Sequence, residues 1–116
     1  MANRHVFSIA EIPQYLYNAG WNLQDKTIAV VLPRRMAVIS LAQRVAQELR
    51  TPRDVGYKIR FDDKTHKGTK IKFITDGAIV REVMSDPLLT QYSVIMVDDA
   101  HDRSVDSDIL LSLLKK

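Results

Sequence analysis

The sequence predicts an α/β domain built around a mostly parallel β-sheet with helices on its faces. Two observations support this prediction: short apolar runs of strand length alternate with stretches of helical periodicity, and polar residues follow directly after the strands. The chain has 116 residues, of which 46% are hydrophobic, which is enough for one domain with its own core. No internal repeat or linker divides it, so we expect residues 1–116 to form a single domain.

Short runs of β-forming residues predict three strands. They are residues 27–32 (TIAVVL), which end before Pro33, residues 70–75 (KIKFIT), which end before Asp76, and residues 93–97 (SVIMV), which end before Asp98. Weaker patterns at residues 5–10 (HVFSIA) and 55–61 (VGYKIRF) predict two more strands.

Apolar residues at helical spacing predict the helices. Residues 36–50 carry one apolar stripe, made of Val38, Leu41, Ala42, Val45 and Leu49. A second helix starts near Gly77 and ends before Pro87, and a last one starts at a cap formed by Asp106 or Ser107.

Three clusters of polar, charged or glycine residues follow the three clearest strands. They are Arg34 with Arg35, then Thr75 with Asp76 and Gly77, and then Asp98 with Asp99. In open α/β sheets, ligands bind outside the carboxyl ends of the strands. We therefore expect the three clusters to line one crevice.

The acidic cluster suits a hydrated magnesium ion, because Mg²⁺ takes one or two carboxylates and keeps several waters. The alternative is that one of Asp98 and Asp99 caps the next turn and the other is solvated. His101 suits either a general base or a hydrogen-bonded structural group. A receiver domain also uses an acidic pair beside Mg²⁺, but there the pair follows the first strand, whereas here it follows the last.

The other two clusters each have two interpretations. Arg34 and Arg35 lie near the start of a helix, where they suit a phosphate backbone, or they form a solvated basic turn. Thr75 and Asp76 suit a binding loop or, more simply, a helix cap.

Composition indicates the cellular location and the kinds of partner that we expect for the protein. The formal net charge is +3 and the isoelectric point is about 9.3, which is compatible with nucleic acid as a partner. The sequence has no cysteine, which excludes disulfides and thiolate metal sites. No apolar run approaches the roughly 18 residues of a membrane span. We expect a soluble protein of the nucleus or cytoplasm, without a membrane partner.

Most of the chain closely resembles the first RecA-like domain of DEAH-box RNA helicases, in the branch that includes splicing helicases. The resemblance rests on the segments IPQYLYNAGW, PRRMAVISLAQRVAQEL, VGYKIRFDD, IKFITDG, REVMSDPLLTQYSVIMVDDAHDRS and DILLSLLKK. It implies a partial P-loop NTPase fold, with ATP and magnesium as cofactors. It also implies RNA and the proteins of helicase complexes as partners.

The resemblance assigns roles to the residues of each cluster. VDDAHDRS stands at the DEAH motif, which implies that Asp98 holds magnesium and that Asp99 and His101 are catalytic. The arginines of PRR and the residues of TDG match motifs that contact RNA backbone, which assigns that role to Arg34, Arg35, Thr75, Asp76 and Gly77. Arg44 matches an arginine that stacks on the adenine ring.

Several positions depart from the family pattern. Residues 1–11 (MANRHVFSIAE) stand in place of the GxxxxGK[ST] phosphate loop and contain neither glycine nor lysine. Asp99 and Asp102 replace glutamates, and Val31 and Leu32 replace polar residues. The chain also ends at Lys116, before the Ser-Ala-Thr motif and the second domain of the family. We expect a fragment or degenerate helicase relative that is inactive alone; the alternative is a non-catalytic RNA-binding or regulatory protein-interaction module.

Overall fold

The sheet of this domain has five strands in the order β3-β2-β4-β1-β5. The structure is a computed structural model and describes residues 9–22 and 25–97. Its elements, in chain order, are α1 (Glu11–Asn18), β1 (Thr27–Leu32), α2 (Arg35–Leu49), the short 3-10 helix η1 (Pro52–Asp54), β2 (Val55–Ile59), β3 (Asp62–Asp63), β4 (Ile71–Thr75), α3 (Asp76–Ser85) and β5 (Tyr92–Val97).

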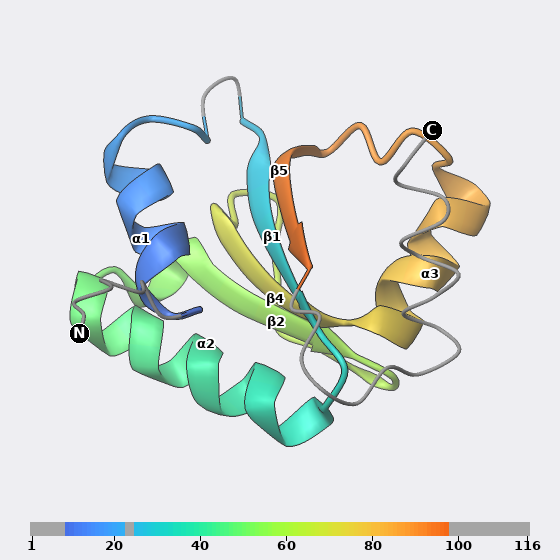
Figure 1. The fold of residues 1–116 in the computed structure, drawn as a ribbon, viewed down its shortest axis with the longest axis horizontal. Helices are drawn as coiled ribbons and strands as arrows, with labels where there is room; N and C mark the ends of the chain where they lie inside the picture. The colour runs from blue at the N-terminus through green and yellow to red at the C-terminus, as the bar shows by residue number, and fades with distance from the viewer. Residues whose placement is uncertain (1–8, 23–24, 98–116) are drawn as a thin grey trace, which may run out of the picture.

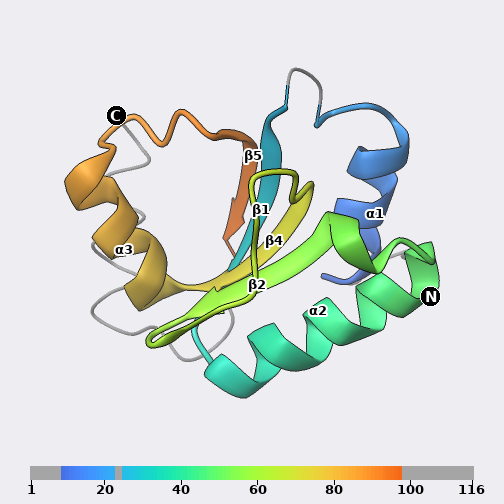
Figure 2. The same ribbon diagram turned by 180° about the vertical axis from the view of Figure 1, so that it is seen from behind.

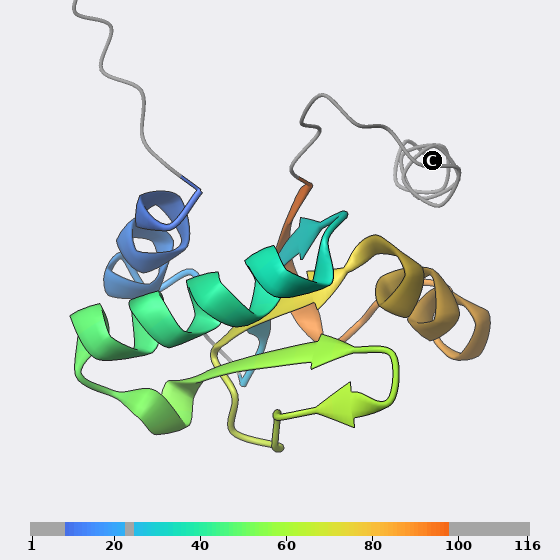
Figure 3. The same ribbon diagram turned by 90° about the horizontal axis from the view of Figure 1, so that it is seen from below.

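The sheet is parallel except for its short edge strand. β2 pairs with β4, β4 with β1, and β1 with β5, all in parallel, while β3 pairs antiparallel with β2. Figure 3 shows β2 turning back directly into β3. The predicted α/β class with a mostly parallel sheet is confirmed.

Helices cover both faces of the sheet. Figure 1 shows α1 and α2 on one side of the sheet and α3 on the other, and the view from behind in Figure 2 agrees. Alternate residues of β1 belong to different layers, because Val30 and Leu32 join the core under α1 and α2 while Ala29 and Val31 join the core under α3. All six residues of β1 are buried, which explains why its sequence is continuously apolar after Thr27.

The structure confirms the principal strands and helices and shifts some of their ends. The strand at 27–32 has the predicted limits, and those predicted at 70–75 and 93–97 each differ by one residue. The helix predicted at 36–50 runs from Arg35 to Leu49 and stops at Arg50, whose φ of 59° lies in the left-handed region. The strand predicted at 55–61 ends at Ile59, because the chain reverses at residues 60 and 61.

Two predicted elements lie mostly or wholly outside the described residues. These are the strand at 5–10 and the helix starting near Asp106 or Ser107. Of the predicted strand only Ile9 and Ala10 are described, and they form a turn just before α1. Within residues 9–22 and 25–97, none of the helices combines the length and the apolar character that a membrane span requires.

Candidate functional site at the carboxyl ends of the strands

Two of the three predicted clusters lie next to each other at one edge of the sheet. The last residue of β1, Leu32, is paired with the last residue of β4, Thr75. The chain leaves β1 through Pro33 to Arg34 and leaves β4 directly into Asp76. The structure therefore confirms that the arginines and the Thr-Asp-Gly segment follow neighbouring strand ends.

The arginine cluster begins α2. Arg34 is the N-cap residue in an extended conformation, and its carbonyl accepts a hydrogen bond from the amide of Val38 at 3.1 Å. Arg35 is the first residue of the helix, and both arginine side chains are exposed. The first turn of α2 contains no acidic residue. Two guanidinium groups and the amide end of a 15-residue helix thus give this corner a positive potential.

The Thr-Asp-Gly cluster begins α3. Thr75 occupies the N-cap position with φ −75° and ψ 155°, yet its side chain makes no capping hydrogen bond. The buried carboxylate of Asp76 accepts a hydrogen bond from the amide of Gly77 at 2.7 Å. Thr75 therefore occupies the predicted cap position without a capping bond from its side chain, and the carboxylate of Asp76 binds one amide of the first helical turn instead.

The predicted acidic cluster lies outside the described residues. This applies to Asp98, Asp99 and His101, about whose positions nothing is stated. The strand that leads to them, β5, ends at Val97, which is paired with Val31 near the end of β1. Among the residues that the structure describes, no group of three histidines or carboxylates is arranged to hold a metal ion.

Arg44 is separate from the strand-end clusters. It follows Arg35 by nine positions on α2, which corresponds to about 13 Å along a helix axis. Its guanidinium is exposed and forms an ion pair with Glu48 at 3.0 Å. Glu48 also accepts a hydrogen bond from Gln14 of α1 at 2.7 Å. The hydrogen bonds from Gln14 and Arg44 lower the pKa of Glu48 below its usual range.

The tight turn between β2 and β3 adds two residues that the sequence patterns did not single out. Ile59 pairs with Asp62, so Arg60 and Phe61 alone form the loop of this hairpin. The turn follows the carboxyl end of β2, which pairs in parallel with β4, so it belongs to the same edge as Thr75. The Phe61 ring is 93% exposed, and the Arg60 guanidinium lies 4.8 Å from the centre of the ring.

Phe61 also has an unusual backbone conformation. Its φ of 67° lies in the left-handed region, which a bulky residue adopts at a cost of about 1–2 kcal/mol. An exposed aromatic ring gains little from packing in return. The sequence signal is an aromatic residue at the end of a strand pattern, which predicts one more strand residue rather than a turn.

The chain is similar to several curated RNA helicases. It is 52% identical over 108 residues to "Pre-mRNA-splicing factor ATP-dependent RNA helicase DEAH10" of Arabidopsis thaliana, an alignment that covers 91% of this chain and 15% of that protein. It is 53% identical over 109 residues to "Probable ATP-dependent RNA helicase DHX35" of Homo sapiens, covering 91% of this chain and 16% of the relative. For "ATP-dependent RNA helicase DHX33" of Homo sapiens the identity is 50% over 107 residues, covering 90% and 15%.

These relatives are much longer than the chain. The chain spans about 15% of the length of the curated relatives that it matches. No family model matches the sequence.

Proposed function

We propose, from the premise that this chain is a relative of the DEAH-box ATP-dependent RNA helicases, that the strand-end edge binds the backbone of single-stranded RNA. In this proposal the chain is a partial RecA-like domain. Arg34, Arg35, Thr75, Asp76 and Gly77 form the RNA-contacting surface. The relatives named above are RNA helicases, which supports RNA as the partner.

The observation that carries the proposal is the pairing of Leu32 with Thr75. It brings an exposed pair of arginines beside a second helix start at one edge of the sheet. Guanidinium groups bind phosphate oxygens through charge-assisted hydrogen bonds, and the amides at a helix start donate to the same oxygens. The phosphates of one RNA strand are thus a ligand whose charge suits this edge.

The hairpin turn extends the proposed surface along the same edge. The exposed ring of Phe61 offers a face on which an unpaired base stacks, and such stacking contributes about 1–3 kcal/mol per base. The guanidinium of Arg60 lies over one face of the ring and adds positive charge there, which leaves the other face for a base. Backbone contacts at the helix starts and base stacking at the turn together favour single-stranded RNA over a duplex.

The nucleotide part of the proposal rests on the family pattern alone. We assign Asp98 as a magnesium ligand, Asp99 and His101 as catalytic residues, and Arg44 as the adenine contact. Bound ATP with magnesium would supply the phosphoryl transfer that drives RNA remodelling. Residues 1–11 contain no glycine or lysine where the family pattern has its phosphate loop, so we propose that the chain as printed does not hydrolyse ATP.

One relative is named a pre-mRNA-splicing factor, which supports a role in nuclear RNA–protein complexes. Protein partners of such complexes belong to the proposal. A regulatory module that acts through these contacts alone would bind no RNA, and the experiment below distinguishes it.

The experiment measures binding of a fluorescent single-stranded RNA at several salt concentrations. Each phosphate contact contributes about 0.7 to the slope of log affinity against log salt, so Arg34→Ala/Arg35→Ala should lower the slope by about 1.4. The matched control is Arg53→Ala/Lys64→Ala, which removes two exposed positive charges near the opposite ends of the strands. An unchanged slope in the first variant, or an equal loss in the control, contradicts the assignment, and an intact chain without RNA binding favours the regulatory module.

A further inference from the structure

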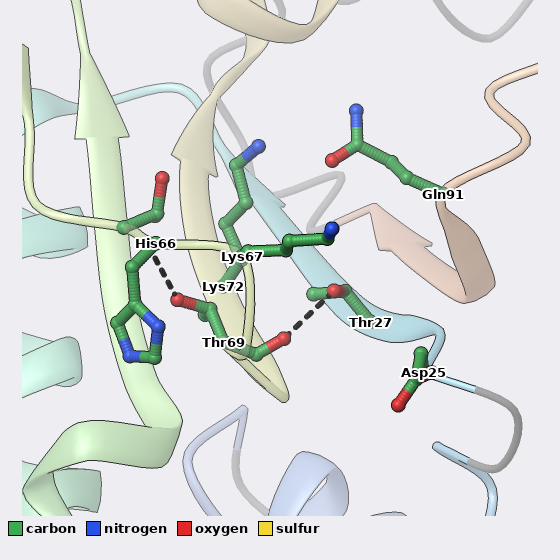
Figure 4. Close-up of a pocket in the computed structure, with 8 residues that line it drawn as sticks. Asp25, Thr27, His66, Lys67, Thr69, Lys72 and Gln91 are labelled. Atoms are coloured by element: carbon green, nitrogen blue, oxygen red, sulfur yellow. Dashed lines mark hydrogen bonds between the residues drawn. The ribbon is translucent and has the colours of Figure 1, made fainter.

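A basic pocket lies at the amino ends of the strands, on the edge opposite to the proposed RNA surface. It has a volume of about 270 Å³. Thr27 is the first residue of β1, Lys72 is the second of β4, and Gln91 immediately precedes β5. The other lining residues belong to loops: Asp25, Thr65, His66, Lys67 and Thr69. Figure 4 shows these side chains around the opening.

Hydrogen bonds within residues 63–69 fix the wall of this pocket. The amide of Thr65 donates to Asp63 at 3.0 Å, and the amide of His66 donates to the hydroxyl of Thr69 at 2.9 Å. The hydroxyl of Thr27 donates to the carbonyl of Thr69 at 2.8 Å, which ties the loop to β1. The wall is therefore held in place by hydrogen bonds of the protein itself.

The imidazole of His66 is fully engaged in this wall. Its Nδ1 accepts a hydrogen bond from the amide of Gly68 at 3.0 Å. Its Nε2 lies 2.6 Å from the carbonyl of Arg53, and a carbonyl requires a donor there. Both ring nitrogens are thus satisfied in the neutral form, so His66 acts as a fixed structural part of the pocket.

The positive charge of the pocket comes from two lysines of different kinds. Lys67 is exposed, and it forms no ion pair within the described part of the chain. Lys72 is buried and contacts Glu82 at 2.8 Å, while Lys58 contacts the same carboxylate oxygen at 2.9 Å. Two ammonium groups therefore share one carboxylate, which leaves this group with a net positive charge.

Acidic residues nearby do not cancel this charge at the opening. Asp25 also lines the pocket, but its side chain is 98% exposed and pairs with Lys70 at 3.8 Å. Asp63 and Asp86 act on the neighbouring Tyr92 electrostatically, yet Asp63 is bonded to Thr65 and Asp86 to Thr90. Neither of these last two carboxylates lines the pocket.

The lining groups offer donors that converge on one space. Glu82 and Tyr92 take two of the three ammonium N–H groups of Lys72. Because the hydroxyl oxygen of Thr69 accepts a bond from His66, its own proton is available to donate. Figure 4 shows the amino groups of Lys67 and Lys72 reaching this space from two separate segments. The amide nitrogen of Gln91 donates to Glu82 at 3.3 Å, so Gln91 lines the pocket without serving as its main donor.

We propose that this pocket binds a phosphate group, either as the free ion or as part of an RNA chain. Its donors suit an anion with several oxygens, and lysine binds phosphate as a point charge. A water occupies about 30 Å³ in the liquid, so the pocket has room for a phosphate and the waters it retains. The site is separate from the strand-end surface, and it makes the amino edge a second place of contact for phosphate.

The test is a titration of the full 116-residue chain with inorganic phosphate, followed by amide chemical shifts at constant ionic strength. We expect saturable shifts at Thr65, Gly68, Thr69 and Gln91. Lys67→Ala should weaken the affinity about tenfold, because one charge-assisted hydrogen bond is lost. Lys64→Ala is the control, since it removes an exposed lysine three positions away that does not line the pocket.

A parallel titration with a short single-stranded RNA identifies the source of the phosphate group. Shifts at the same amides that depend on Lys67 identify a phosphate of the RNA chain, whereas shifts with inorganic phosphate alone identify the free ion. The proposal is overturned if neither ligand gives saturable shifts at these amides. It is also overturned if Lys67→Ala binds like the parent chain, or if Lys64→Ala loses as much affinity.

Discussion

Glu82 on α3 joins that helix to the sheet through a buried carboxylate. It contacts Lys72 of β4 at 2.8 Å and Lys58 of β2 at 2.9 Å, and it accepts a hydrogen bond from the hydroxyl of Tyr92. Burial raises the pKa of Glu82, but hydrogen bonds from Lys72, Tyr92 and Lys58 outweigh it and hold the pKa below the usual value. Burial and the neighbouring carboxylate raise the pKa of Tyr92.

Replacing this carboxylate should destabilise the domain strongly. In Glu82→Gln the ammonium of Lys72 stays buried without a counter-charge, and loss of one partner of a buried pair costs about 3–5 kcal/mol of unfolding free energy. Urea denaturation at pH 7 measures this loss. Glu48→Gln is the matched control, because Glu48 forms an exposed ion pair and should change stability little.

The same carboxylate should shape the response to acid. The folded pKa of Glu82 lies below the ordinary value of 4.5, so its contribution to stability is complete above 4.5 and is lost as the pH falls through the folded pKa. We expect Glu82→Gln to lack this part of the decline when stability is measured from pH 6 down to acid. Parallel declines below pH 4.5 in the parent chain and the variant would contradict the assignment.

At the scale of the elements, the strands that are buried on both faces of the sheet are the easiest to predict from the sequence. β1 is apolar after Thr27 and β4 is apolar except for Lys72 and Thr75, because helices cover both sides of the sheet, and such runs are recognisable without structural knowledge. The two-residue strand β3 is too short to show a pattern. Helix α1 has Pro13 in its first turn and a largely exposed or half-buried surface, so its local pattern did not identify it.

The order of the strands and the hairpin turn follow from packing rather than from local pattern. The last described strand, β5, pairs with the first, β1, and no local periodicity contains that pairing. Likewise, a Phe at the end of the VGYKIRF pattern looks like one more strand residue. Only the register of Ile59 with Asp62 shows that Phe61 lies in a two-residue turn.

The conformation of Phe61 predicts opposite effects on stability and on RNA binding. Phe61→Gly relieves a left-handed conformation at an exposed position, so stability should stay unchanged or rise by up to about 1 kcal/mol. The variant should bind single-stranded RNA more weakly, because the stacking surface is lost. Phe61→Leu is the companion variant, because it keeps the backbone strain but lacks the aromatic ring. Weaker RNA binding in both variants would show that the loss of stacking, and not the change in backbone strain, is the cause. RNA binding equal to that of the parent chain in both variants would remove Phe61 from the proposed surface.

Gly56 on β2 is required by a close backbone approach. A Cβ atom there would lie 2.5 Å from the carbonyl oxygen of Lys64, closer than packing allows. Gly56→Ala should therefore lower the free energy of unfolding by about 1–3 kcal/mol, the typical cost of overpacking. Gly68→Ala is the comparison variant, because its added Cβ would lie 3.1 Å from the side chain of His66, an overlap of only a few tenths of an ångström, so it should cost less stability than Gly56→Ala. Equal urea midpoints for Gly56→Ala and the parent chain would show that the strand can separate from residue 64.

At the scale of the whole molecule, the strand-end rule predicts from the sequence that the polar clusters share one edge of the sheet. It requires only that parallel strands end at one edge, and the pairing of Leu32 with Thr75 confirms this for two clusters. The roles of Asp98, Asp99 and His101 stay predictions. The phosphate pocket at the other edge depends on residues 25 to 91, which only the folded chain brings together. Its one sequence signal was a lysine, Lys72, inside an apolar strand.

RNA binding and ATP hydrolysis are the two activities proposed from the family. We expect this chain to keep the first and to lack the second. The proposed RNA binding requires exposed cations at the strand ends, and the described residues supply them. ATP hydrolysis also requires a phosphate loop, and the 116 residues contain no GxxxxGK[ST] sequence. We therefore expect saturable binding of single-stranded RNA together with no phosphate release from ATP and magnesium, with or without that RNA. Both are measured on the same preparation, so that a misfolded sample fails the binding assay as well.

Asp98→Ala is the control for any residual signal, because a contaminating ATPase would be insensitive to it. An RNA-stimulated rate that disappears in Asp98→Ala would show that residues 1–11 are no obstacle to hydrolysis and would make the chain an enzyme.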